Sequence, residues 1–444
     1  MGKEKAGEDA RWSVAPIALL IVVGGVIANL LFNVLATILG AGFPYSTFVF
    51  SPDDRYGDFF KLTFSYPGAP VHPSPAHWGM SDLFAAFEAQ IVAVAGTTHN
   101  HFHLPPLATL LALLWRLVMQ WVDPVLLFLG LLAAGLAALF YTVVRLGPSG
   151  RSAPAFGMIA ILCYPTLLLI DRGHFFSLIT GTLLIAATLR ILRDGKTDFW
   201  SVLMFAIALN FRPNAGIIPL ALFLCRKGFS ARDLLFLCAA VLGVFGASLL
   251  AAHQLYPAYD LAAFRAGLKD YAGLYIVNGY SQAYGSSLLG MLRALFGYGQ
   301  LTFSLPIFVA AALFAATIIG SWRGLLQVPE LVFLVLAVYV LGSQAFADYH
   351  LLVFIVPLML LARERGVGDW SDWVILIACS FVLAPKNYIF HPSTGIIPWS
   401  WQIVANPAML LGASAFILAH AWRRRSSTAD RANPSGLERI SRAT

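Results

Sequence analysis

Long apolar runs separated by short polar segments make up most of the chain. The first run, 16–39, is followed by the polar segment 41–104, which is rich in proline, histidine and aromatic residues. A run of about 20 apolar residues can cross a bilayer as a helix. The pattern therefore predicts an all-α, polytopic membrane protein, with the shorter helices buried inside the bundle. The later candidate spans are 105–121, 124–144, 153–170, 175–192, 200–211, 215–225, 234–252, 301–320, 331–341, 351–362, 373–384 and 405–421.

Lysine and arginine occupy every second loop from Arg145 onward. Cytoplasmic loops of membrane proteins carry an excess of these residues, so we place the basic loops in the cytoplasm and the alternate loops on the extracytoplasmic face. The basic loops are 145–151, 190–196, 226–232, 322–323, 363–365 and 423–425. The alternate loops are 171–174, 212–214, 253–300, 343–350 and 385–401.

The number of crossings before Arg145 must be even if the N-terminus is also cytoplasmic, yet three candidate runs precede it. Either the run 105–121 fails to cross, or the run after it bends back. We therefore expect about twelve spans rather than thirteen. The expected organisation is one membrane domain (1–422), with large extracytoplasmic loops at 41–104 and 253–300, and a disordered cytoplasmic tail at 423–444.

Composition agrees with this class. Hydrophobic residues make up 59% of the chain and charged residues 11%, against roughly 25% charged in soluble domains. The net charge of +7 arises from short loop clusters, which follow from topology, so we expect contact with membrane lipids and none with nucleic acid. Four cysteines in or beside apolar runs are expected to be small core residues, without disulfide or zinc: Cys163, Cys225, Cys238 and Cys379.

The stretch SPDDRYGD (51–58) begins the candidate chemistry, because it places carboxylates just beyond the first apolar run. Asp58 lies between Gly57 and two phenylalanines. A carboxylate partly shielded from water among aromatic side chains is a good general base; the alternative is a solvated loop aspartate.

Basic and histidine residues on the same expected side are candidates for binding an anion. Arg212, in LNFRPNAG, lies beside a proline that starts a helix, and a guanidinium pairs with phosphate through two parallel hydrogen bonds. The alternative is an arginine that reaches lipid phosphates. Arg172 and His174, in DRGHFF, could hold the same phosphate, although for Asp171 and Arg172 the favoured interpretation is that they pair with each other.

A second histidine follows late in the chain. His350, in FADYHLL, comes directly after Asp348 and Tyr349 at the outer end of a span, and all three are candidates for binding the donor phosphate or another part of the substrate. A histidine there can hydrogen-bond a phosphate or a sugar hydroxyl, or serve packing alone. Lys386 and His391 lie in the next outer loop and join the set of candidates.

Two clusters have residue types that bind metals. Asp53 and Asp54 could hold a divalent cation through hard oxygens, or begin a helix after Ser-Pro. His99, His101 and His103 alternate in THNHFH, a spacing that a loop presents as readily as a zinc site. We assign no metal and no other cofactor to the candidate site.

Several of these segments, in this order, resemble the family-87 glycosyltransferases. These are membrane enzymes of the GT-C type that include polyprenol-phosphate-mannose-dependent α-mannosyltransferases. The matching segments are GDFF (57–60), HFHLPPLATLL (101–111), RGHFFSLITGTLL (172–184), ALNFRPNAGIIPLALFLCRK (208–227) and FADYHLLVFIVPLMLL (346–361). Each is mainly apolar with one or two polar residues.

The resemblance implies a GT-C-type bundle in which Asp58 is the catalytic base and His350 lies beside the donor phosphate. Arg212 falls where the family usually has lysine before a proline, and His174 where it usually has glutamine. The implied reaction moves mannose or another hexose or pentose from a polyprenyl phosphate to a lipid or glycan acceptor. It would take place on the outer face of the inner (plasma) membrane, with inversion and without a metal.

A secondary transporter, or a lipid or glycolipid flippase, is the main alternative. Transporters place charged residues on broken helices near the middle of the membrane, usually within internal repeats. The two short runs on either side of Arg212 and Pro213 resemble a broken helix, but the halves of the chain show no clear repeat.

Overall fold

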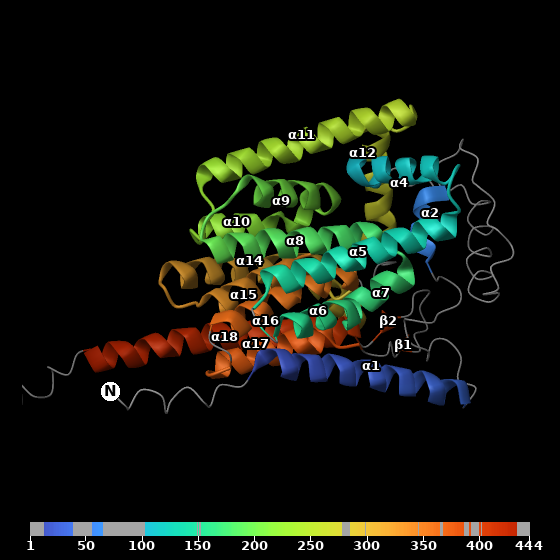
Figure 1. Cartoon of the computed structure of the whole chain (residues 1–444). Coiled ribbons are helices and arrows are strands. Elements are labelled where there is room, and N and C mark those ends of the chain that lie inside the picture. Colours follow the sequence, from blue (N-terminus) through green and yellow to red (C-terminus); the bar gives the residue numbers. More distant parts are fainter. Residues whose placement is uncertain are drawn as a thin grey trace, which may run out of the picture.

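A computed structural model describes residues 13–38, 56–64, 103–148, 150, 152–277, 285–297, 299–344, 346–364, 367–385, 390–391, 399–400 and 402–432. This part of the chain forms a bundle of helices, as the apolar pattern predicts (Figure 1). Two short strands, β1 (Phe390–His391) and β2 (Trp399–Ser400), pair antiparallel in the loop before the last helix.

Within the described ranges, six helices are long and apolar enough to cross a membrane. Helix starts are set by capping side chains that accept hydrogen bonds from free backbone N–H groups, as Asp123 does from Val125 and Leu126. The six helices are α1 (Val14–Ile38), α5 (Pro124–Leu146), α8 (Phe175–Asp194), α11 (Ala231–Leu255), α14 (Gln300–Trp322) and α18 (Gln402–Ala432).

The run expected at 153–170 is broken. It forms α6 (Ser152–Leu162) and α7 (Tyr164–Arg172), which meet at an angle of 42°. Pro165, in the first turn of α7, lacks a backbone N–H and clashes with the preceding turn, so a straight helix cannot pass through it. The bend brings the end of α7 beside the start of α8.

Shorter apolar helices fill the interior and both ends of the bundle. Residues 329–341 of α15 (Val328–Leu341) are all buried, which explains why this helix is apolar on every side after Glu330 in its first turn. The others are α4 (Pro106–Val118), α9 (Phe199–Phe211), η2 (Pro213–Gly216) with α10 (Ile217–Leu224), η5 (Asp348–Phe354) with α16 (Ile355–Glu364), and α17 (Trp370–Leu383).

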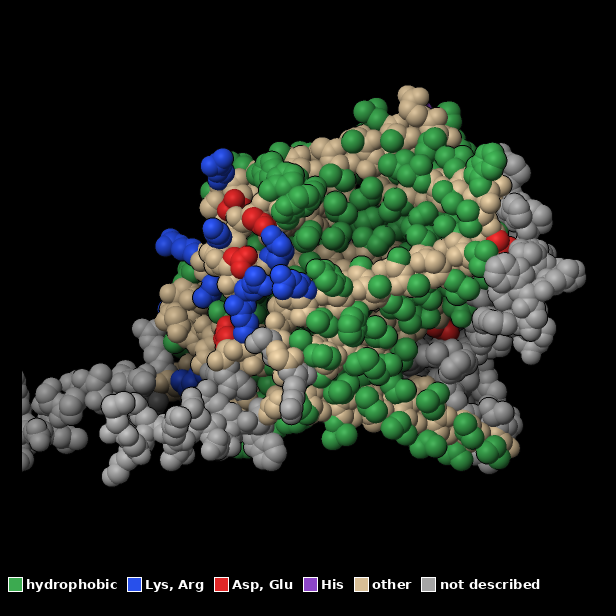
Figure 2. All heavy atoms as spheres, in the orientation of Figure 1, with side chains coloured by type: hydrophobic (Ala, Val, Ile, Leu, Met, Phe, Trp, Pro, Cys, Tyr) green, Lys and Arg blue, Asp and Glu red, His purple; other side chains and the backbone are tan. Residues whose placement is uncertain are grey.

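Lysine and arginine side chains gather at one end of the bundle, on the left in Figure 2, while hydrophobic side chains cover the flank in view. We call the end with the lysine and arginine side chains the basic end. The short helix α2 (Gly57–Phe64) and α4 lie at the opposite end, and α4 does not extend toward the basic end (Figure 1). Helix α4 covers 13 residues of the run expected at 105–121.

Three sequence-based expectations need correction. The loop expected at 253–300 contains α12 (Leu261–Tyr271), the π-helix η3 (Ala272–Val277) and α13 (Leu288–Phe296). The segment expected as a tail from residue 423 begins as helix, because α18 continues to Ala432. Cys238 is exposed on α11, whereas Cys163, Cys225 and Cys379 are buried. Most of the first outer loop, 41–104, lies outside the described residues.

Candidate functional site

Asp58 occupies the first turn of α2, at the end of the bundle opposite the basic end. The chain enters α2 through Tyr56, which adopts a left-handed φ of 58° and donates its N–H to the carbonyl of Asp171 at 2.6 Å. Phe59 and Phe60 follow and are almost fully buried. These contacts hold the backbone on either side of Asp58 against the rest of the bundle.

Gly173, between α7 and α8, allows α2 to pack this closely. Its φ is +69°, and a Cβ at this position would lie 3.0 Å from the Cβ of Phe59 and 3.2 Å from Cε2 of Phe128. Any other residue would have to push α2 away or change the turn. The glycine in DRGHFF therefore brings two distant segments of the sequence together.

Arg172, in the last turn of α7, faces Asp58. Its Nη2 lies 3.8 Å from Oδ1 of Asp58, and the two side chains are 17% and 24% exposed. This separation exceeds hydrogen-bond length, so the pair is electrostatic and the carboxylate is still accessible. The oxygens of an accessible carboxylate can accept a hydrogen bond from the hydroxyl of a ligand.

His174 caps the start of α8. Its Nδ1 accepts the N–H of Ser177 at 3.2 Å, which leaves the proton of the neutral ring on Nε2, free to donate to a ligand. Burial lowers the pKa of His174 to about 4, with the charge of Asp58 opposing the shift and that of Arg212 adding to it. The ring stacks on Tyr349 with centroids 4.6 Å apart.

Arg212 joins α9 to η2 and has an extended backbone, as expected for a residue before proline. Among the described residues, its guanidinium has no hydrogen bond and no ion pair within 4.0 Å. Its charge nevertheless acts on His174, Tyr349 and His350. An arginine this close to the other candidates, with its donors unused, is suited to binding an anion.

The two polar residues of η5 differ in their surroundings. His350 is 3% exposed, with Nε2 3.4 Å from Oγ of Ser177. Asp348 is fully buried, and its two oxygens accept hydrogen bonds from the hydroxyl of Tyr164 at 2.7 Å and the N–H of Ser286 at 2.8 Å. Asp348 therefore fastens η5 to α7 and to the start of α13.

The structure brings six of the predicted site residues together: Asp58, Arg172, His174, Arg212, Tyr349 and His350. Asp348 lies in the same segment but is engaged by other protein groups. The remaining candidates, Asp53, Asp54, His99, His101 and Lys386, lie outside the described residues, as does the side chain of His391. Within the described ranges, no three histidine, cysteine, aspartate or glutamate residues form a group that could hold a metal.

Two tyrosines at the candidate site were not among the residues predicted from the sequence. Tyr271, at the end of α12, acts electrostatically on Tyr349 and stacks on His103 with centroids 5.0 Å apart; burial lowers the pKa of His103 to about 4. Tyr339 lies in α15 and interacts with Arg212. A hydroxyl inside an otherwise apolar run was the only signal that could have identified Tyr339.

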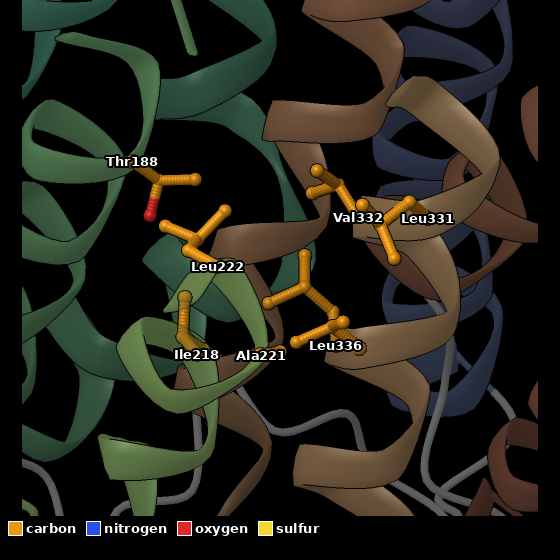
Figure 3. Close-up of a pocket in the computed structure, with 8 residues that line it drawn as sticks. Thr188, Ile218, Ala221, Leu222, Leu331, Val332 and Leu336 are labelled. Carbon is orange, nitrogen blue, oxygen red and sulfur yellow. The ribbon is translucent and has the colours of Figure 1, made fainter. Parts of the chain in front are cut away.

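A narrow apolar hollow opens between α8, α10 and α15 (Figure 3). Its only polar lining residue is Thr188, so it offers no partner to a charged group. Leu336, which lines the hollow, lies three residues before Tyr339 on α15. This is a separation of about 4.5 Å along the helix axis. The hollow is lined by Thr188, Ile218, Ala221, Leu222, Leu331, Val332, Val335 and Leu336.

Comparison with known proteins identifies no relative: no protein-family profile matches the chain, and none of the curated proteins matches it.

Proposed function

We propose that the chain is a membrane glycosyltransferase, which moves a sugar from a polyprenyl phosphate to a hydroxyl of a lipid or glycan acceptor. One observation supports this most strongly. A partly accessible carboxylate, Asp58, lies in the same site as Arg212, a cation that uses none of its donors within the described part of the chain, although the sequence separates the two widely. The resemblance of several segments to family-87 glycosyltransferases points to the same reaction.

The proposed topology has twelve passes in the inner (plasma) membrane, with both termini cytoplasmic. The passes are α1, α5, α6 with α7, α8, α9, η2 with α10, α11, α14, α15, η5 with α16, α17 and α18. The concentration of lysine and arginine at one end supports this orientation, because basic loops stay in the cytoplasm (Figure 2). The site containing Asp58 then faces the periplasm or exterior.

In the proposed reaction, Asp58 acts as general base. It takes the proton of the acceptor hydroxyl while the hydroxyl oxygen forms a bond to the anomeric carbon of the sugar. The bond between that carbon and the phosphate oxygen breaks on the opposite face, and its electron pair leaves with the polyprenyl phosphate. Attack and departure on opposite faces invert the anomeric configuration. No redox partner is needed.

The two arginines have different proposed roles. Arg172 pairs electrostatically with Asp58 at 3.8 Å and helps to position the base. Arg212 is available to neutralise the charge that develops on the leaving phosphate, with Nε2–H of His174 as a further donor. Donors fixed before the reaction stabilise developing charge most effectively, and His174 is fixed by its bond to Ser177.

The lipid part of the donor would follow the apolar surface below the site. From a phosphate at Arg212, the hollow between α8, α10 and α15 begins about one helical turn beyond Tyr339. Its lining is apolar except for Thr188 (Figure 3), but it is narrow, so a prenyl chain would fit only if α8, α10 and α15 moved apart. The outer segments around His103 and α12 would form the part of the site that binds the sugar acceptor.

A transporter or flippase is the second candidate, favoured by one feature. The chain between α9 and α10 is broken at Arg212 and η2, as in helices that bind transported ions or substrates. The gathering of charged candidates at one end of the bundle, rather than at its middle, favours the enzyme.

The test uses purified protein in lipid vesicles with a panel of polyprenyl-phosphate sugars, mannose included, and a parallel flux assay. We expect the wild type to form a glycosylated product with at least one donor and Asp58→Asn to form almost none while still folding. Flux without transfer would support the transporter. Transfer by Asp58→Asn at the wild-type rate would overturn the assignment of the base.

A further inference from the structure

Tyr339 presents a buried hydroxyl group whose role the proposed reaction leaves open. The residue is 3% exposed, and its hydroxyl has no hydrogen-bond partner in the described part of the chain. Buried polar groups are almost always hydrogen-bonded, because burial without a partner removes the bonds they make to water. Tyr339 is one of several buried polar groups without a partner among the described residues, so its neighbours decide what could bind its hydroxyl.

The neighbours of Tyr339 indicate what that partner is. The tyrosine interacts electrostatically with Arg212, whose guanidinium also has no hydrogen bond or ion pair within the described ranges. Its ring packs edge-on against Phe346 with centroids 5.6 Å apart, and Phe346 packs in the same way against His350. Tyr339 thus belongs to the candidate site, beside its free cation.

Neighbouring contacts fix the backbone of both residues. The hydroxyl of Ser343 donates to the carbonyl of Tyr339 at 2.6 Å, and Asn214 donates its Nδ2–H to the same hydroxyl at 2.9 Å. Asn214 lies two residues after Arg212 in η2. This chain of hydrogen bonds ties the segment that carries Arg212 to the end of α15 that carries Tyr339.

We propose that the Tyr339 hydroxyl and the Arg212 guanidinium bind the same phosphate group, so that Tyr339 is a phosphate-binding residue. The chemistry fits, because a phosphate oxygen accepts hydrogen bonds from both groups and neutralises the arginine. This inference rests on the proposed function for the identity of the phosphate as that of a polyprenyl phosphate. The pairing of Tyr339 with Arg212 itself does not depend on sugar transfer.

The test removes only the hydroxyl. Full-length Tyr339→Phe in lipid nanodiscs is assayed for binding of polyprenyl phosphate, of polyprenol without phosphate, and of inorganic phosphate. We expect about tenfold weaker binding of polyprenyl phosphate and unchanged binding of polyprenol. If inorganic phosphate displaces polyprenyl phosphate from the wild type, free phosphate is enough to occupy the site. If it does not, binding requires the lipid part as well. Both results are compatible with a phosphate bound by Tyr339 and Arg212.

Tyr259→Phe is the matched control. Tyr259 is fully buried, but its hydroxyl donates to the carbonyl of Leu104 at 2.6 Å. We expect this variant to have a lower Tm and unchanged phosphate-lipid affinity. Tyr339→Phe should show the reverse, because its hydroxyl has no partner in the described chain to lose.

Unchanged binding of polyprenyl phosphate by Tyr339→Phe, or an equal loss for polyprenol, would overturn the inference. A fall in Tm like that of Tyr259→Phe would overturn it too, since it would show that the hydroxyl is bonded to protein. Failure of the proposed function gives a different result. In that case the wild type transfers no sugar, yet its binding of phosphate still depends on Tyr339.

Discussion

At the basic end of the bundle, Arg424 lies 2.6 Å from Glu330 and 2.9 Å from Asp369, whereas at the opposite end Arg212 has no ion pair with any described residue. The contrast extends to the carboxylates. Asp369 also contacts His420 at 3.0 Å, while Asp58 is separated from Arg172 by 3.8 Å. The charges of Arg424, Glu330 and Asp369 are therefore satisfied by one another, whereas Arg212 has no such partner among the described residues.

The satisfied network has a structural explanation. Glu330 is fully buried at the start of α15, Asp369 caps α17, and Arg424 lies on α18. The network thus joins three helices. Partial burial would raise the pKa of Asp369, but the hydrogen bond from His420 and the charge of Arg424 hold it below its ordinary value. Groups that fold a protein find their partners inside it, whereas groups that bind a ligand keep their capacity open.

Replacing the two aspartates separates these roles most strongly. We expect Asp58→Asn to lower the rate of sugar transfer by about 10²- to 10⁴-fold, because the amide cannot accept the proton, with little change in Tm. Asp369→Asn should leave transfer nearly unchanged and lower Tm. The paired measurements are initial transfer rates and thermal unfolding in the same detergent. Equal losses of activity in both variants would remove the distinction between the two ends.

The two arginines give the next largest difference. Arg212→Gln should lower transfer by about 10²- to 10³-fold through lost stabilisation of the leaving phosphate, without lowering stability. Arg424→Gln leaves Glu330 buried without its cation, and should destabilise the fold by about 3–5 kcal/mol. Chemical unfolding and transfer rates measure the two effects. Destabilisation by Arg212→Gln as large as that of Arg424→Gln would show that Arg212 is structural.

Two glycines with left-handed backbones test how α2 is positioned. Gly173→Ala and Gly195→Ala both strain the backbone, at φ values of +69° and +65°, but only the first places a Cβ against Phe59 and Phe128. Each should lose about 1–2 kcal/mol of stability from the backbone alone. Gly173→Ala should in addition lower transfer by displacing Asp58. Equal transfer rates in the two variants would argue that the packing of α2 does not position the base.

The smallest expected effect is a pH dependence of stability. Above about pH 6.5, His174 is neutral in both the folded and the unfolded chain. Because its pKa in the folded protein is about 4, between these values the unfolded chain binds a proton that the folded chain does not. Stability therefore falls as the pH decreases toward 4.

The variant His174→Gln should lose less stability than the wild type as the pH falls. Some loss should persist, because burial of His103 has an effect of the same sign. Thermal unfolding between pH 7.5 and pH 4 measures this difference in stability between the variant and the wild type. Identical pH profiles for the variant and the wild type would contradict a buried neutral His174.

The helices and the two ends of the bundle could be predicted from the sequence, because a single physical rule governs each of them. Apolar runs located the helices, because every backbone group in a bilayer must be paired within its own segment. The alternation of basic loops separated the two ends, and it placed Arg172, His174, Arg212 and His350 on the side of Asp58 before any contact was known. Both rules act locally or through the membrane, so they can be read without tertiary structure.

Tertiary contacts were beyond the reach of those rules. Asp348, a predicted substrate-binding residue, accepts hydrogen bonds from Tyr164 and Ser286, which are distant in sequence and could not be foreseen as its partners. Tyr339 was overlooked because a tyrosine in an apolar run is ordinarily a packing residue. Helix α12 was overlooked because its capping Asp260 and short apolar stripe lie in a polar segment. In each case the role depends on which segments meet, which the order of residues does not state.

The most direct test of the central claim is an experimental structure of the protein with polyprenyl phosphate bound. The account predicts the phosphate at the end of the bundle opposite the basic loops, within hydrogen-bond distance of Arg212, with Asp58 in the same cavity. A phosphate bound at the basic end, or a lipid whose phosphate lies away from Arg212 with Asp58 facing bulk water, would contradict it.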